Sequence, residues 1–397
     1  MDPVRNPFAP SAGRRPPELA GRDEILAAAN TATRRAAIGK YARPTMLLGL
    51  RGTGKTVLLN EFRKIGEGHG LIVSSIEAPE GANLARLVVP EMRKVLRSLS
   101  SVESARHRAA KGLRGLRNFA ALFKLEVAGI GVGIEGASDD EPGLADSGDI
   151  QFDLPDLFEL LGTAARLAGK GWLLLVDEVQ YLDENDLAAL IVSLHRVSQS
   201  DLPVAFAGAG LPQVARLAGE AKSYAERLFT YPGVGPLSPD AAAAAIARPI
   251  EAEGARIEPS AVMQIVEATQ GYPFFIQEWG AKVWDIARGP TITIADVNSA
   301  REPAKASLDE GFFKVRLDRL TRAETTFVIE MAKLGDGPVP LGNIAKALGR
   351  TTQSLGPTRA SIIHKGMIYG AEHGYLAFTV PLFADFMRRH AANGEMR

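Results

Sequence analysis

Short apolar runs alternate with helix-length segments in the part of the chain that precedes Pro236. Four of these runs have the length of a β-strand and carry no charge: residues 45–48, 71–76, 172–176 and 204–207. A continuous apolar run is typical of a parallel strand that is buried on both faces of its sheet. The alternation therefore predicts an α/β domain in which helices cover both faces of a parallel sheet.

The two flanking regions follow other patterns. Residues 1–20 contain five prolines, which block helix formation, and we expect them to form a flexible, extended arm. After Pro236 the apolar spacing is helical, and Ser238, which precedes a proline, is a typical N-cap. We therefore expect an α/β core over residues 21–235 and an all-helical region over residues 236–312.

The remaining residues, 313–397, have a mixed pattern. Helices are expected at 321–334, 341–348 and 351–365. Two short apolar runs then flank Glu372–Gly374, which predicts a small β-hairpin. This region is expected to be a separate C-terminal domain.

Composition excludes several classes of protein. The chain has 397 residues with 46 Lys and Arg against 46 Asp and Glu, so no overall charge favours nucleic acid or membrane. It has no cysteine, which excludes disulfides and thiolate metal sites. The six histidines are scattered without metal-binding spacing. No signal peptide or membrane span is recognisable, and we expect a cytoplasmic, soluble protein without a membrane partner.

Charge is distributed unevenly within residues 91–159, which lengthen the α/β core. Nine Lys and Arg meet two acids over residues 91–124, whereas residues 125–160 contain ten acids and no Lys or Arg. The basic part has an apolar stripe at helical spacing. It is either a solvated amphipathic helix or a contact surface for DNA, a protein partner or a second subunit.

The segment that follows the first predicted strand reads GLRGTGKT, from Gly49 to Thr56, and we call it the P-loop. It fits G-x-x-x-x-G-K-[ST] at every fixed position and lies between a strand and a helix. Its backbone N–H groups and the helix N-terminus are suited to phosphates. We therefore expect ATP to bind through Gly49, Leu50, Arg51, Gly52, Thr53, Gly54, Lys55 and Thr56. Lys55 should reach the β- and γ-phosphates, and Thr56 should bind Mg²⁺.

A second motif completes the predicted site. The buried run 173–176 delivers Asp177 and Glu178 to the carboxyl edge of the sheet, where ligands of such folds bind. Asp177 is expected to hold Mg²⁺ through water. Glu178 is expected to polarise the attacking water.

Together these motifs resemble the AAA+ superfamily of P-loop ATPases. Within it, the chain is most similar to the bacterial and archaeal ATPases that stand near the origin-recognition ATPases and the STAND signalling NTPases. The resemblance implies that Gly21 and Arg22 lie beside the adenine. It implies that residues 236–312 are a lid over the nucleotide, with Pro273 in a G-x-P signature, and that residues 313–397 are a winged helix.

The sequence departs from the AAA+ pattern at two positions, and the resemblance also suggests one candidate for an arginine finger. The end of the fourth strand, where such ATPases carry a polar sensor residue, reads Gly208-Ala209-Gly210, and Gln213 is the nearest substitute. The helix after Gly271 lacks the usual arginine for the γ-phosphate. Both departures reduce the expected hydrolysis rate. Arg227 is either an arginine finger for a neighbouring subunit or an ordinary surface residue.

The sequence leaves three hypotheses for function. The first is an ATPase whose nucleotide state moves the lid and winged helix, with double-stranded DNA as a partner of Arg359 and Lys365. The second is a STAND-like switch that hydrolyses ATP slowly and controls a protein partner. The third is a nucleotide-binding scaffold without turnover. Residues 321–397 contain nine Lys and Arg against six acids, a small excess for DNA binding.

Overall fold

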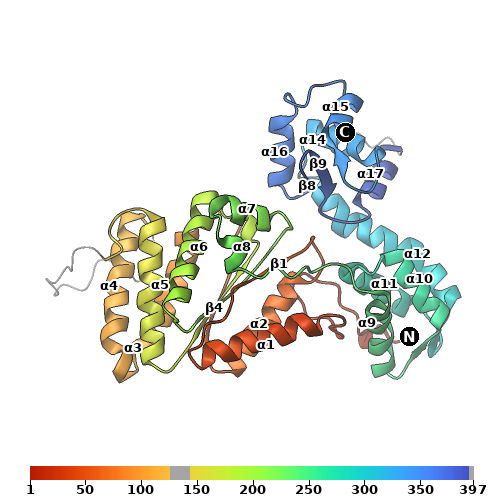
Figure 1. Cartoon of the computed structure of the whole chain (residues 1–397). Coiled ribbons are helices and arrows are strands. Elements are labelled where there is room, and N and C mark those ends of the chain that lie inside the picture. The colour runs from red at the N-terminus through yellow and green to blue at the C-terminus, as the bar shows by residue number, and fades with distance from the viewer. Residues whose placement is uncertain (126–143, 393–397) are drawn as a thin grey trace. The chain divides into compact units, whose positions relative to one another are not determined.

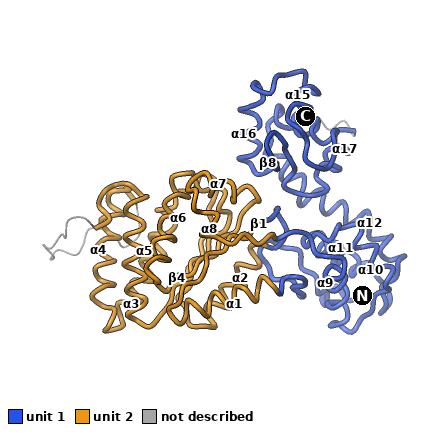
Figure 2. Tube along the Cα trace, in the orientation of Figure 1, with its two compact units in different colours: residues 1–23, 49–54, 234–397 blue, residues 24–48, 55–233 orange. Residues whose placement is uncertain are grey.

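The computed structural model describes residues 1–125 and 144–392, and the chain divides into two compact units. Unit 1 comprises residues 1–23, 49–54 and 234–397, and unit 2 comprises residues 24–48 and 55–233 (Figure 2). The unit boundary between residues 233 and 234 lies close to the one expected after residue 235, whereas no unit boundary falls at residue 312. The P-loop segment 49–54 belongs with the C-terminal part of the chain, and the expected lid and C-terminal domain form one unit.

Unit 2 is built on a parallel sheet, as the apolar runs predicted (Figure 1). Its strands lie in the order β1-β4-β3-β2, and all three neighbouring pairs are parallel. Their bounds are β1 Thr45–Leu48, β2 Ile72–Glu77, β3 Trp172–Asp177 and β4 Val204–Gly210. Residues 230–233 run alongside the other edge of β1, where Thr230 and Gly233 form parallel bridges. The fold class is therefore that of a P-loop NTPase.

Helices cover both faces of this sheet. They are α1 Asp23–Ala37, α2 Lys55–Gly68, α3 Leu84–Ser100, α4 Arg106–Leu122, α5 Ile150–Leu167, α6 Glu184–Gln199, α7 Val214–Ala221 and α8 Ala225–Leu228. Trp172 and Leu174 of β3 join one apolar core with α3, α4, α5 and α6. The intervening Leu173 contacts α2, where a Cβ on Gly66 would lie 2.7 Å from its side chain. All six residues of β3 are buried, because the strand has helices on both sides.

The charge-uneven insert contributes α3, α4 and α5. Helix α4 buries the predicted apolar stripe at Ala109, Leu116 and Ala120, so the amphipathic helix is confirmed. Only part of the acidic segment, from residue 144, falls within the described residues. The acidic loop that was expected to include residues 126–143 therefore lies partly outside the described residues.

Unit 1 is mainly helical. Its helices are α9 Pro239–Ala252, α10 Pro259–Thr269, α11 Pro273–Ile286, α12 Ile294–Leu308, α13 Val315–Leu317, α14 Arg322–Lys333, α15 Leu341–Ala347, α16 Gly356–His364 and α17 Phe383–Ala392, with a π-helical turn at Asp309–Lys314 between α12 and α13. The strands are β5 Arg256–Ile257, β6 Thr291–Ile292, β7 Val339–Pro340, β8 Ile368–Glu372 and β9 Tyr375–Phe378. Strands β8 and β9 form the predicted hairpin, and β7 pairs with β9. Strands β5 to β7 are two residues long and gave no apolar run in the sequence.

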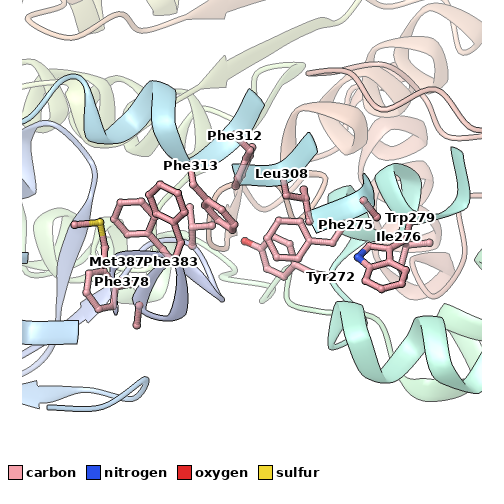
Figure 3. Packing of buried hydrophobic residues seen from close by; sticks show 14 of the residues in the cluster. Tyr272, Phe275, Ile276, Trp279, Leu308, Phe312, Phe313, Phe378, Phe383 and Met387 are labelled. Atoms are coloured by element: carbon pink, nitrogen blue, oxygen red, sulfur yellow. The ribbon is translucent and has the colours of Figure 1, made fainter. Parts of the chain in front are cut away.

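One aromatic core extends through unit 1 across the expected boundary at residue 312 (Figure 3). Phe275 of α11 lies 5.7 Å from Phe312 and 5.9 Å from Phe313, measured between ring centroids. Phe313 in turn lies 5.8 Å from Phe383 of α17. The two regions therefore share a continuous apolar core, which explains why they form one compact unit.

The N-terminal segment differs from the flexible arm that its prolines suggested. Phe8 is only 4% exposed and packs against Gly280 of α11. The Asn6 side chain donates hydrogen bonds to the carbonyl of Ala281 (3.1 Å) and to Asp285 (2.9 Å). Prolines block a helix, but they do not prevent an extended segment from packing through an aromatic anchor.

Candidate nucleotide site

The P-loop connects the end of β1 to the start of α2. Gly54 has a φ of +96°, which residues with a Cβ rarely adopt, and the chain turns here into the first residue of α2, Lys55. The N-terminal end of α2 carries the partial positive charge of the helix dipole, which favours anions. The local geometry is therefore the one expected from the sequence.

Within unit 1, three residues from distant parts of the sequence contact residues 49–54. The Tyr272 hydroxyl donates a hydrogen bond to the carbonyl of Arg51. The Arg22 guanidinium donates to the carbonyls of Thr53 (3.3 Å) and Gly235 (2.5 Å). The main-chain N–H of Arg51 donates to the carbonyl of Thr379 (3.2 Å). The tip of the loop is thus bonded to the N-terminal segment, the expected lid and the C-terminal region.

Within unit 2, Thr56 and Asp177 come together as expected. The Thr56 hydroxyl donates to Oδ2 of Asp177 at 2.5 Å, and the N–H of Glu178 donates to Oδ1 at 2.8 Å. Burial raises the pKa of Asp177, while these two hydrogen bonds act in the opposite direction. Lys55 is 7% exposed and lowers the pKa of Asp177 through its charge. The exposed Thr56 therefore bonds directly to a buried carboxylate, whose pKa also responds to the charge of the buried Lys55.

Glu178 has an unusual backbone conformation. Its φ of 55° and ψ of 40° lie in the left-handed region, which a non-glycine residue adopts rarely and mostly where the surrounding structure enforces it. The chain then continues into a short helical turn, Val179–Tyr181. The Gln180 side-chain amide donates to the Glu178 carboxylate. This contact was not anticipated from the sequence, because it depends on the turn that follows β3.

The remaining expected site residues have different surroundings. Arg22 is 8% exposed, and burial lowers its pKa. Pro273 is the first residue of α11, whereas it is the preceding Tyr272 that reaches the P-loop. Gln213 is half-buried at the start of α7, and its side chain makes no capping bond. Arg227 is exposed on α8 and has no ion pair within the part of the chain that the structure describes.

The C-terminal region differs from the sequence-based expectation in the start of one helix and in the surroundings of Lys365. The helix expected at 351–365 begins only at Gly356, since Pro357 favours the first turn. Lys365 was expected to face DNA, but its ammonium lies 2.6 Å from the Glu324 carboxylate and joins α16 to α14. Lys365 is therefore a structural residue of this region. Lys346 and Arg350, which precede α16 in the chain, are exposed.

Comparison with known protein families agrees with this geometry. The parallel sheet, the P-loop and the Thr56–Asp177 pair define the class of P-loop NTPases. Residues 18–207 match the family described as "AAA ATPase domain", so this part of the chain is an AAA+ ATPase domain and the protein is an ATPase. Residues 310–387 match a family described as a domain of unknown function. A comparison with curated proteins gave no match.

Several solved structures are similar to this chain. The Walker-type ATPase PABY2304 of Pyrococcus abyssi has 15% sequence identity and a TM-score of 0.51, with 93% of this chain and 96% of that chain covered. The ORC1 protein of Aeropyrum pernix, solved in complex with DNA, has 14% identity and a TM-score of 0.45, with 99% and 98% covered. The RuvB Holliday junction branch migration motor of Thermotoga maritima has 16% identity and a TM-score of 0.41, with 90% and 92% covered. At such identities the likeness concerns the fold.

Over residues 1–125 and 144–392, no cluster of three or more His, Asp or Glu side chains has the arrangement of a metal centre. Within the same residues, no helix combines the length and apolar character needed to cross a bilayer.

Proposed function

We propose that the chain binds ATP with Mg²⁺ at the P-loop, hydrolyses it, and passes its nucleotide state to the lid and the C-terminal domain. The observation that carries this proposal is the set of contacts at Arg51. Its carbonyl accepts from Tyr272 of the lid, and its N–H donates to Thr379 of the C-terminal domain. A change of loop conformation on phosphate binding would alter both contacts.

The residues at the carboxyl edge of the sheet fit Mg²⁺. Proteins usually bind this ion through one or two carboxylates together with substrate phosphates, and Thr56 and Asp177 supply a hydroxyl and a carboxylate from adjacent positions. When bound, Mg²⁺ would neutralise phosphate charge. Asp177 and Thr56 would hold it, Lys55 would bind the terminal phosphates, and Glu178 would orient and polarise the attacking water.

A turnover measurement tests the chemical part of the proposal. Glu178→Gln should keep ATP affinity and reduce turnover by about 10²- to 10⁴-fold, because the amide keeps the shape of the side chain and loses its basicity. The carboxylate of Glu184 at the start of α6 provides a control, and Glu184→Gln should retain turnover. Wild-type turnover at the level of a no-enzyme blank would refute the proposal.

We further propose that DNA is the partner of the C-terminal domain, which we interpret as a winged helix from its three helices α14, α15 and α16 and the hairpin β8-β9. Lys346 and Arg350 are exposed just before the polar turn 351–354, which suits phosphate contacts. Helix α4 offers a second basic surface, since Arg108, Arg114 and Arg117 are exposed and α4 contains no acid.

Fluorescence anisotropy on duplex DNA at several salt concentrations tests this partner, with and without a non-hydrolysable ATP analogue. Replacing Lys346 and Arg350 by Ala should weaken binding and reduce the slope of log affinity against log salt by about 1.8, at about 0.9 per phosphate contact. Lys333→Ala is a matched control, because Lys333 already pairs with Glu330 (2.6 Å).

A second candidate function is a slow switch of the STAND kind that controls a protein partner. The glycine-rich end of β4 and the lack of an arginine early in α11 favour it, because both reduce the expected rate of hydrolysis. No detectable DNA binding at about 50 mM salt in either nucleotide state, where phosphate contacts are little screened, would favour this candidate.

A further inference from the structure

Gln180 connects the carboxylate of Glu178 to the main chain at the end of β4. Its Nε2 donates to Oε2 of Glu178, and its Oε1 accepts a hydrogen bond from the N–H of Leu211 at 3.1 Å. A backbone N–H can only donate, so the Leu211 contact fixes which end of the amide is the oxygen. The NH₂ group must then face Glu178, and it does.

The glycine at the end of β4 makes room for this amide. A Cβ on Gly210 would lie 2.8 Å from Oε1 of Gln180 and 2.6 Å from the side chain of Val214. The end of β4 has no polar side chain of its own, and the Gln180 amide from the turn after β3 lies there instead. The parallel pairing of β3 with β4 brings the two ends together.

The other end of Glu178 is also held. Its N–H donates to Asp177 at 2.8 Å, and its backbone is in the left-handed region. A non-glycine residue adopts that conformation rarely, and mostly where the surrounding structure enforces it. With the backbone held by Asp177 and the carboxylate held by Gln180, the side chain has little rotational freedom left.

We infer that Gln180 is a positioning residue for Glu178, which holds the carboxylate in its working orientation and connects it to the end of β4. The inference rests on the role proposed for Glu178. The end of β4, at Gly208, Ala209 and Gly210, has no polar side chain that could act as a sensor. Gln213 was the expected substitute, and we assign this role to Gln180 instead.

The experiment compares steady-state ATP turnover and ATP affinity in variants of the 397-residue chain. Gln180→Ala removes both bonds, and Gln180→Glu keeps the shape but places a second carboxylate against Glu178. Each should lower kcat by about 10- to 100-fold, the usual cost of misplacing a catalytic group, and leave the Kd for ATP within about twofold. Gln199→Ala, at an exposed position at the end of α6, is the matched control and should keep wild-type kcat.

A second variant tests the same contact without changing either partner. Gly210→Ala should displace the Gln180 amide and lower kcat in the same way. The double variant Gly210→Ala with Gln180→Ala should be no slower than the slower single variant, since both changes remove one interaction. A purely structural role would instead lower the thermal unfolding midpoint and ATP affinity together.

The outcomes separate this inference from the function on which it rests. If the wild type does not hydrolyse ATP, or if Glu178→Gln leaves turnover intact, the proposed function fails. If Glu178→Gln abolishes turnover while Gln180→Ala stays within twofold of wild type or is faster, the proposed function stands and the positioning role of Gln180 is wrong.

Discussion

The main-chain N–H of Arg51, at the tip of the P-loop, donates a hydrogen bond to the carbonyl of Thr379 at 3.2 Å. Thr379 is 1% exposed, and its own hydroxyl donates to the carbonyl of Gly366 at 2.7 Å. The C-terminal domain therefore contacts the loop through a residue that is itself held in place. Both partners are main-chain groups, so neither can rotate as a side chain would to follow a shift of the loop. A small change in the loop conformation would therefore weaken this hydrogen bond.

Removal of the Tyr272 hydroxyl should loosen the P-loop. Burial raises the pKa of Tyr272 well above its ordinary value, so the hydroxyl stays protonated and donates to Arg51 at any ordinary pH. Tyr272→Phe removes one buried hydrogen bond, worth about 0.5–1.5 kcal/mol, and should weaken ATP binding by up to about tenfold. Calorimetric titration with ATP measures this, with the exposed Tyr375→Phe as control. Equal affinity in all three proteins would show that the contact is not coupled to nucleotide binding.

Lys55→Ala should nearly abolish ATP binding. A charge-assisted hydrogen bond of this kind contributes about 1.5–3 kcal/mol, which corresponds to about tenfold or more in affinity. Lys64→Ala, on the exposed side of the same helix, removes a lysine that pairs with Glu61 (2.7 Å) and should bind ATP normally. Calorimetry that found the same ATP affinity for Lys55→Ala and wild type would contradict the assignment of the P-loop.

Arg227→Ala should reduce turnover and preserve ATP affinity if the protein forms a head-to-tail homo-oligomer. Arginine fingers contribute about 10³–10⁵ in rate in well-studied NTPases, and a slow switch would gain less. Lys55→Ala subunits retain Arg227, so mixing them with Arg227→Ala subunits should restore activity at intact P-loops. Absence of such complementation in an assembly verified by light scattering would make Arg227 an ordinary surface residue.

Acid should destabilise unit 1 through Glu324. Burial alone would raise the pKa of this carboxyl, but hydrogen bonds from Lys365, Ser361 and Thr321 lower it from 4.5 to about 2. The native state therefore binds its proton less readily than the unfolded state. The resulting stability is fully present above about pH 4.5 and is lost as the pH falls towards 2.

Urea unfolding of wild type and Glu324→Gln between pH 6 and pH 3 checks this expectation. The wild type should be the more stable protein at pH 6, and its advantage should shrink at pH 3. The matched variant Glu330→Gln changes an acid on the same helix that forms an exposed pair, and it should show no comparable trend. A constant difference between wild type and Glu324→Gln across this range would exclude the proposed linkage.

The local patterns of the sequence predicted the strands and the phosphate loop well. Residues 45–48 form β1 as expected, and the loop that follows is fixed by its glycines and by the helix start at Lys55. Asp177 could be predicted because a buried strand delivers it to the edge of the sheet. In each case the information lies within about ten residues of the site.

Contacts between distant segments could not be predicted in this way. The Gln180 bridge requires the register of β3 against β4, and the role of Tyr272 requires the approach of α11 to the P-loop. Lys365 looked like an exposed cation in the sequence, but Glu324 neutralises it from a helix that is far away along the chain. Even Phe8 gave no local sign that Gly280 leaves space for its ring.

The contacts of the P-loop also bear on which truncated forms of the protein keep the nucleotide site intact. The match to the AAA ATPase domain ends at residue 207, yet Tyr272 and Thr379, which support the loop at Arg51, both lie beyond it. A truncated protein that ends at residue 233 would retain every letter of the ATP-binding signature and lose these two supports. We therefore expect such a fragment to bind ATP more weakly than the 397-residue chain.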